Sequence, residues 1–270
     1  MFDYFRQAKA DEVAALQKAA ANGTLPEPLP ERRPSFSGAL RAGANACGLS
    51  VIAEYKIASP SQGDIALEVT PGAAAAAYAS AGASAMSVLT EESKFKGSLS
   101  FIHDAWAGGA GCNGLPLLRK DFIFEPLQVL ATAATPASAV LLIVKLTPSA
   151  TLLRELRQTA ESFGLECVVE ILDEKDLAIA RQSGATIIQA NARDFSDLSV
   201  DLNRSLALAR RHAGEADELW IAASGFSRAE ELRPAAEAGF TAILAGTALM
   251  RGGNPAESLA RLTAGLTEGK

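Results

Sequence analysis

Eight short apolar segments, separated by longer helix-like stretches, dominate the chain between residues 49 and 246. They are rich in Val, Ile, Leu and Ala, which is typical of parallel strands buried on both faces. Their ranges are 49–56, 84–89, 116–122, 139–144, 166–171, 185–190, 219–224 and 241–246. Strict alternation of strand and helix, repeated eight times, predicts a closed (β/α)8 TIM barrel. An open doubly wound sheet would have fewer repeats, and no GxGxxG follows the first strand.

Helical periodicity fills the intervals between these strands, and Ser149 and Asp173 precede two of the helices as N-caps. The expected helices cover residues 71–81, 98–107, 125–134, 149–163, 174–182, 202–212, 228–238 and 256–266. Ahead of the first strand, helical spacing covers residues 2–21, a proline-punctuated connector follows, and a second helix is expected over 36–46. We therefore expect one barrel domain over residues 1–270, with residues 1–47 as a helical extension that packs on the barrel.

Composition and charge narrow the range of partners. The 270 residues carry a formal net charge of −6, which argues against a general nucleic-acid or anionic-membrane binder. No apolar run approaches the ~20 residues needed to cross a bilayer, and the charged N-terminal segment lacks a secretory apolar region. The three cysteines and two histidines form no zinc-binding pattern, so no metal site is expected. These features predict a cytoplasmic protein without nucleic-acid or membrane partners.

Polar side chains stand at the ends of several predicted strands, where the surrounding sequence is apolar. Glu54 and Lys56 end the first strand, Lys120 the third and Glu170 the fifth, while Asn191 follows the sixth. In a barrel the C-terminal strand ends meet at one mouth, and active sites lie there. For each residue alone a solvated rim charge is the alternative, but buried charge is costly without a partner or substrate. Their convergence on one mouth favours a catalytic site.

The loops after the last two strands contain Ser224-Gly225 and Gly246-Thr247, and they indicate an anion site. Phosphate often binds between these two loops in barrels. Glycine lets backbone N–H groups approach an oxyanion, and a hydroxyl adds a donor. Each dipeptide is also common in ordinary turns, so it is their paired position that supports the prediction. The loop over residues 57–63 is small enough to serve as a lid, with an ordinary turn as the alternative.

Longer motifs occur in a specific order along the chain. They read IAEYKIASPS (52–61), SVLTEESKFKGS (87–98), LPLLRKDFIFEPLQV (115–129), VVEILDEKDL (168–177), NARDF (191–195), ASGF (223–226) and AGTALMRGGNP (245–255). In this order and spacing the chain resembles the indole-3-glycerol-phosphate synthase family of tryptophan biosynthesis, over nearly its whole length. The combination of ExKxxSPS, LRKDF and a later VE before DE is the most specific part of the resemblance.

The resemblance implies an enzyme, a carboxy-lyase. It would close the ring of 1-(o-carboxyphenylamino)-1-deoxyribulose 5-phosphate to give indole-3-glycerol phosphate, with loss of CO2 and water. The roles that it implies are general acid for Lys120, general base for Glu170, and electrostatic partner for Lys56. Glu54 would orient the lysines, and Asn191 would lie beside the reacting ring. The reaction has no redox step, so neither a metal nor an organic cofactor is expected.

The resemblance also implies substrate-binding positions around this catalytic set. They are Ser59 and Arg193 for the anthranilate carboxylate, Phe95 and Phe122 as walls for the aromatic ring, and Ser224, Gly225, Gly246 and Thr247 for the phosphate. Core packing is the alternative for the two phenylalanines. The expected partner is a small phosphorylated substrate. A monomer or weak dimer is expected, and contact with neighbouring enzymes of tryptophan biosynthesis is left open.

Several positions depart from the family's pattern, including Ile57 and Gln62, where members often carry basic residues. Ala223 replaces a carboxylate, Gln189 replaces a glycine, and Leu172 replaces a histidine. They leave open an alternative function, a non-catalytic or altered-specificity barrel that binds a related phosphorylated ligand. Phosphoribosylanthranilate isomerase and the tryptophan synthase α-subunit are weaker alternatives, since neither is expected to carry the ExK and RKDF set.

Overall fold

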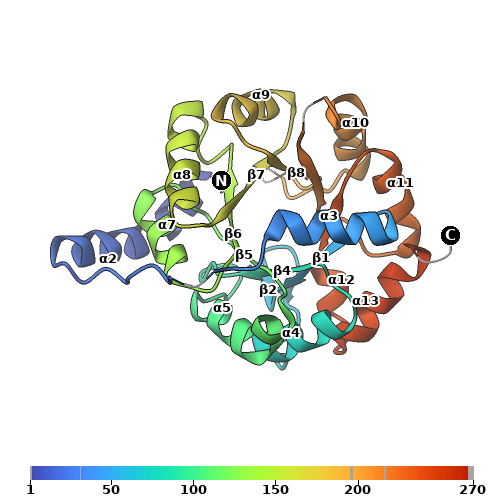
Figure 1. Ribbon diagram of the computed structural model, residues 1–270, viewed down its shortest axis with the longest axis horizontal. Helices are drawn as coiled ribbons and strands as arrows, with labels where there is room; N and C mark the ends of the chain where they lie inside the picture. Colours follow the sequence, from blue (N-terminus) through green and yellow to red (C-terminus); the bar gives the residue numbers. More distant parts are fainter. Residues whose placement is uncertain (1, 31, 195–196, 216, 267–270) are drawn as a thin grey trace.

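The structure is a computed structural model that describes residues 2–30, 32–194, 197–215 and 217–266. Eight parallel strands close into a barrel in their order along the chain, with β1 paired to both β4 and β10 (Figure 1). They are β1 (Ser50–Tyr55), β4 (Ala85–Leu89), β5 (Leu117–Lys120), β6 (Ala139–Ile143), β7 (Glu166–Ile171), β8 (Ile187–Asn191), β9 (Leu219–Ala223) and β10 (Ala242–Ala245). The predicted (β/α)8 barrel is confirmed. Each strand lies within its predicted range, except that β8 ends one residue later, at Asn191.

Helices surround the barrel and largely follow the predicted ranges. They are α4 (Pro71–Ser80), α5 (Ser100–Ala105), α6 (Gly111–Asn113), α7 (Pro126–Ala133), α8 (Ala150–Ser162), α9 (Glu174–Ser183), α10 (Leu202–His212), α11 (Leu232–Glu237), α12 (Thr247–Met250) and α13 (Pro255–Thr263). The side chains of Ser149 and Asp173 cap α8 and α9 as predicted, because each accepts a hydrogen bond from a first-turn backbone N–H. The short helix α12, which begins at Thr247, was not predicted.

The helix expected over residues 98–107 is longer and less regular than predicted. Helix α5 continues through a π-helical turn, η1 (Trp106–Ala110), into α6. The turn lies against α4 so closely that a Cβ on Gly108 would stand 2.1 Å from the Cα of Gly72. Glycine at both positions therefore permits this contact between the two helices. A short 3-10 turn, η2 (Ala229–Glu231), leads directly into α11. Another, η3 (Ala264–Leu266), follows α13 and ends the described part of the chain.

Side-chain alternation along the strands separates an inner core from an outer one. Ile52 and Ile221 belong to the cluster inside the barrel, whereas their neighbours Val51 and Ala222 belong to the cluster under the helices. Because side chains alternate with a period of two residues, the charged residues at the strand ends also point toward the barrel axis. They are Glu54, Lys120 and Glu170. The inner core therefore ends, at the C-terminal side of the strands, in a charged layer.

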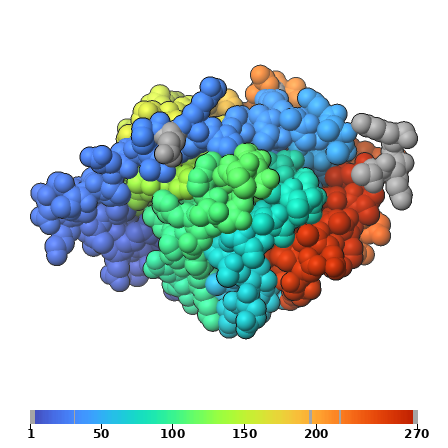
Figure 2. Space-filling view, turned by 60° about the horizontal axis from the view of Figure 1, so that its bottom comes forward, coloured from blue at the N-terminus to red at the C-terminus, as the bar shows by residue number. Residues whose placement is uncertain are grey.

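The N-terminal region contains three helices, α1 (Phe2–Ala8), α2 (Ala10–Ala21) and α3 (Phe36–Cys47). The single helix predicted over residues 2–21 is interrupted at Lys9, whose buried ammonium turns toward the barrel. Helix α3 lies across the N-terminal strand ends, where Leu40 packs into the inner core and its carbonyl accepts from the Ser50 hydroxyl (Figure 1). The space-filling view shows the N-terminal segment running along the barrel, with one part projecting at the side (Figure 2).

The loop after β1 forms a small antiparallel hairpin between β2 (Ala58–Ser59) and β3 (Gly63–Asp64). The expectation of a small loop is met, although the hairpin gives it more regular structure than an ordinary turn. Its action as a lid stays a prediction. Within the described ranges, no helix has the length and apolar character needed to cross a membrane.

Candidate active site

Glu54, Lys56 and Lys120 meet at the C-terminal mouth of the barrel. The Nζ of Lys56 lies 3.0 Å from Oε1 of Glu54, and the Nζ of Lys120 lies 3.8 Å from Oε2. The Glu54 side chain is only 4% exposed, against 15% and 17% for the lysines. Burial by itself would raise the pKa of Glu54, but the two ammonium groups outweigh burial and lower the pKa.

Glu170 is buried beside this cluster, and the charges of Lys120 and Glu54 act on it. It is 3% exposed, and its Oε2 accepts a hydrogen bond of 2.6 Å from the amide of Gln189. Burial raises the pKa of Glu170, while the charge of Lys120 and hydrogen bonds from Asn191 and Gln189 act in the opposite direction without cancelling the rise. A carboxyl group whose pKa is raised above its ordinary value is better suited to exchanging protons than an ordinary surface glutamate.

A cavity of about 250 Å³ opens over the charged layer. Eleven of the thirteen predicted site residues line it, namely Glu54, Lys56, Phe95, Lys120, Phe122, Asn191, Arg193, Ser224, Gly225, Gly246 and Thr247. Ser59 lines an adjoining cavity of about 450 Å³ that shares Lys56, Phe95, Arg193 and Thr247 with the first. The structure thus brings the predicted residues together at one mouth, with Glu170 buried beside the described lining.

One wall of the cavity is aromatic. The rings of Phe95 and Phe122 are 6.5 Å apart between centroids, and Phe122 stacks on Phe5 of α1 at 3.7 Å. Glu91 holds the loop that carries Phe95, since its carboxylate accepts from the backbone N–H groups of Lys94 and Phe95. Phe122 is both a core residue and a cavity wall, so the two interpretations offered for it from the sequence are not exclusive.

The opposite side of the cavity is built from the two glycine-containing loops. Ser224 and Gly225 both have positive φ angles, 68° and 91°, so the backbone turns sharply where this loop meets the cavity. At Gly246, a Cβ would stand 2.3 Å from Oε1 of Glu54, so only glycine fits beside the charged layer. Arg251 also lines this cavity and adds a guanidinium that sequence reasoning missed. Arg251 lies one helical turn after Thr247, and this spacing could have indicated from the sequence that Arg251 belongs to the site.

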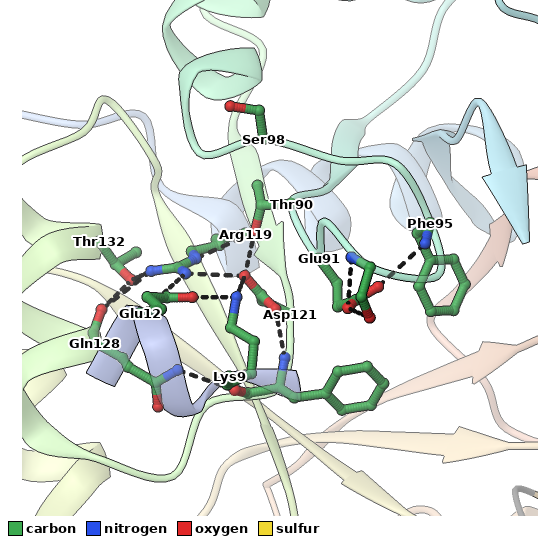
Figure 3. A network of polar contacts seen from close by, with 12 residues as sticks. Lys9, Glu12, Thr90, Glu91, Phe95, Ser98, Arg119, Asp121, Gln128 and Thr132 are labelled. Atoms are coloured by element: carbon green, nitrogen blue, oxygen red, sulfur yellow. Dashed lines mark hydrogen bonds and ion pairs between the residues drawn. The ribbon is translucent and has the colours of Figure 1, made fainter. Parts of the chain in front are cut away.

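A buried polar network supports the strand that carries Lys120 (Figure 3). Arg119 is 1% exposed and donates to Asp121 at 2.9 Å and to Glu12 of α2 at 3.0 Å. Lys9 donates to the same carboxylate of Asp121 at 3.0 Å, and it also pairs with Glu12. The network therefore ties the N-terminal helices to β5 through four charged groups.

Asp121 is the centre of this network and also lines the cavity. Its Oδ1 accepts from the backbone N–H of Phe122 at 2.8 Å, and its Oδ2 accepts from the Thr90 hydroxyl at 2.7 Å. Burial opposes ionisation of Asp121, but Arg119 and Lys9 outweigh it and lower its pKa to about 2. Sequence reasoning assigned no role to Arg119 or Asp121, although both stand in the LRKDF motif.

Curated proteins of one family match the chain along most of its length. A family model described as indole-3-glycerol phosphate synthase matches residues 3–262. Proteins of that name from Chlorobium chlorochromatii and Desulfotalea psychrophila are 39% and 37% identical to the chain. The first alignment covers 92% of this chain and 94% of the relative, and the second covers 94% and 95%. The protein of the same name from Aquifex aeolicus is 39% identical, with 87% and 89% covered.

Solved structures with the same fold are more distant in sequence. Thiamine phosphate pyrophosphorylase from Pyrococcus furiosus superposes with a TM-score of 0.60 at 14% identity, covering 82% of this chain and 97% of that one. A 3-hexulose-6-phosphate synthase gives a TM-score of 0.60 at 15% identity, covering 80% and 99%. At such identities the likeness concerns the fold alone. The sequence matches go further, and by them the chain belongs to the indole-3-glycerol phosphate synthase family.

Proposed function

We propose that the chain closes the ring of 1-(o-carboxyphenylamino)-1-deoxyribulose 5-phosphate to give indole-3-glycerol phosphate, CO2 and water. The observation that carries the proposal is that Lys120, at the cavity surface, lies near enough to the buried Glu170 for its charge to act on that carboxylate. An aromatic wall and an anion-binding pair of loops flank these two groups on opposite sides. This arrangement matches a substrate with an aromatic ring at one end and a phosphate at the other.

Lys120 acts in this proposal as the general acid. The ring carbon that bears the carboxylate attacks the ketone carbon, and the ketone oxygen takes a proton from the Lys120 ammonium as the new carbon–carbon bond forms. At 3.8 Å the ion pair with Glu54 is longer than a hydrogen bond, so the ammonium protons are not held by that carboxylate. CO2 then leaves, and the electrons of the broken bond restore the aromatic ring.

Glu170 acts as the base in the second stage. The hydroxyl formed at the former ketone carbon takes a proton from an ammonium of the lysine cluster and leaves as water, and Glu170 removes the ring proton whose loss completes the indole. A buried carboxylate with a raised pKa holds such a proton better than a solvated one. Lys56 stabilises negative charge on the substrate, Glu54 orients the two lysines, and Asn191 contacts the reacting region.

The remaining residues bind the two ends of the substrate. Arg193 and Ser59 receive the carboxylate of the anthranilate part, next to the aromatic wall of Phe95 and Phe122. The loops of Ser224-Gly225 and Gly246-Thr247 receive the phosphate, together with Arg251. Because the acid and base lie between these ends, binding both ends would hold the reacting atoms over the charged layer.

The test is incubation of the purified protein with the authentic substrate, followed by mass spectrometry of the product and calorimetric measurement of binding. We expect conversion to a product lighter by one CO2 and one water. Saturable binding with no change in mass would contradict the proposal and favour a non-catalytic barrel, an alternative that the matches to named synthases do not support. Absence of both binding and turnover would contradict either function.

Thr247→Ala is expected to raise KM about tenfold and to leave kcat within about twofold, because the hydroxyl contacts the phosphate rather than the reacting atoms. Initial rates over a range of substrate concentrations measure both constants. The matched control is Thr263→Ala in α13, whose hydroxyl donates to the carbonyl of Leu259 within its own helix. An unchanged KM for Thr247→Ala, or an equal effect of the control, would remove Thr247 from the phosphate site.

We further propose that the protein acts in the cytoplasm, as a monomer or weak dimer, and without a metal or organic cofactor. The net charge of −6 and the acid–base character of the reaction support this proposal. Analytical ultracentrifugation over a range of protein concentrations tests the oligomeric state, and a stable higher oligomer would contradict it.

A further inference from the structure

Gln189 occupies an inward-facing position in the middle of β8. Ile187, two residues earlier, packs in the inner core, while the flanking Ile188 and Ala190 face the helices. Gln189 is fully buried. Its backbone is registered directly beside Glu170 of the neighbouring strand β7. Gln189 therefore lies between the buried carboxylate of Glu170 on β7 and the aliphatic Ile221 on β9.

The Gln189 side chain makes one strong polar contact. Its Nε2 donates to Oε2 of Glu170 at 2.6 Å, whereas its Oε1 has no hydrogen-bond partner among the described residues. Leaving a buried amide oxygen unpartnered destabilises a fold, and an aliphatic side chain of similar size would avoid that penalty. The bond to Glu170 is thus the one polar interaction that the described structure offers for a glutamine here.

The strand on the other side of Gln189 offers no replacement for this bond. On β9 the residue registered beside Gln189 is the aliphatic Ile221, and Ala223, registered beside Asn191, has only a methyl group. From β6 the adjacent inward residue is Ile143. The polar partners of Glu170 are therefore the amides of Gln189 and Asn191 on β8.

We infer that Gln189 is a positioning residue for the ring-closure reaction: it holds the Glu170 carboxylate in one orientation and favours its ionised form, ready to accept a proton. The inference rests on the function proposed above. It assigns to β8 the task of orienting the base in this chain.

The inference has a consequence for pH dependence. The groups that face Glu170 are Lys120 from β5, Glu54 from β1, and the two amides from β8. Burial raises the pKa of Glu170, and the Gln189 hydrogen bond works against that rise. Removing the donor should therefore raise the pKa further. The base must be ionised to accept a proton. As the pH is lowered, activity of a variant without this donor should therefore begin to fall at a higher pH than in the wild type.

The test compares Gln189→Leu and Gln189→Met with the wild type. Relative to the wild type, we expect kcat to be about tenfold lower and KM to stay within about twofold. The acidic limb of the pH profile of kcat should shift to higher pH by about one unit. The melting temperature should be unchanged or higher, because the unpartnered amide oxygen is gone. Ile187→Val, on the same inward face of β8, is the control, and its acidic limb should match the wild type.

A second readout does not depend on turnover. Carbon-13 NMR titration of the Glu170 carboxyl, assigned with Glu170→Gln, should show a higher pKa in both variants. An unchanged titration of Glu170 in the variants would overturn the inference. So would a loss of activity that only follows a loss of thermal stability, or failure of both variants to fold. A wild-type protein that titrates as expected but does not turn over the substrate would count against the proposed function instead.

Discussion

Lys120→Ala is expected to lower kcat by at least ~100-fold while changing KM much less, since proton transfer by a positioned acid typically contributes about 10²–10⁴-fold. The ketone is a poor electrophile until its oxygen is protonated, and alanine has no proton to give. Lys120 also faces a buried carboxylate on each side, Glu54 and Glu170. Stopped-flow fluorescence of indole formation measures the chemical step directly.

The matched control for this substitution is Lys145→Ala. Lys145 also follows a barrel strand, but its ammonium pairs with Asp173 and Asp176, and it is not among the described residues that line the cavity. We expect the control to keep kcat within about twofold. Near-normal turnover by Lys120→Ala would show that the acid is another group, and Lys56 would be the first to examine.

Asp121→Ala is expected to destabilise the fold by about 3–5 kcal/mol, which is the usual range when one partner of a buried ion pair is removed. The change leaves Arg119 and Lys9 buried with Glu12 as their remaining carboxylate in the described network (Figure 3). It also frees the backbone N–H of Phe122 from its acceptor. Urea and thermal unfolding followed by circular dichroism measure the loss, which should lower the melting temperature by roughly 10 °C.

The control for Asp121 is Glu237→Ala, which removes an exposed i,i+4 pair with Arg233 in α11. Such surface pairs contribute little, so a change within about 0.5 kcal/mol is expected. The depressed pKa of Asp121 gives a further check: its contribution is present above about pH 4 and is lost as the pH falls toward about 2. Equal stability of the Asp121 and Glu237 variants would mean that the network is not a structural anchor.

The network also bears on how the chain is organised. We propose that residues 1–47 belong to the same folding unit as the barrel. Phe5 stacks on Phe122, and Lys9 and Glu12 meet Arg119 and Asp121. On this view Asp121→Ala should expose the N-terminal helices to protease as well as lower the global stability. Cleavage confined to the N-terminal segment, with an unchanged barrel transition, would contradict a single unit.

Much of the fold followed from local patterns. Apolar runs such as 139–144 and the intervening helical periodicity predict buried parallel strands with helices over them, and repetition alone leads to the barrel. The candidate active site at the barrel mouth was predicted from a second local signal, because charged residues that interrupt apolar strands need partners. Glu54 and Lys120 were found in this way because every strand of a barrel ends at the same side.

Other features depend on contacts between distant parts of the sequence, and local patterns do not encode them. Lys9 looks like an ordinary helix residue until Asp121, more than a hundred positions later, is placed beside it. The stacking of Phe5 on Phe122 is hidden for the same reason. Gln189 was noted as a departure from the family's pattern, but only the register of β8 against β7 shows that its amide reaches Glu170.

The most direct test of the proposed function is a single-turnover experiment with protein in excess over the authentic substrate, in which indole fluorescence and released CO2 are measured together. The wild type should form indole and CO2 in equal amounts from every bound molecule of substrate. Lys120→Met, whose side chain is unbranched like that of lysine but has no proton to donate, should bind the substrate and form neither product at a comparable rate. Binding without indole in the wild type, or equal rates in both proteins, would contradict catalysis at this mouth of the barrel.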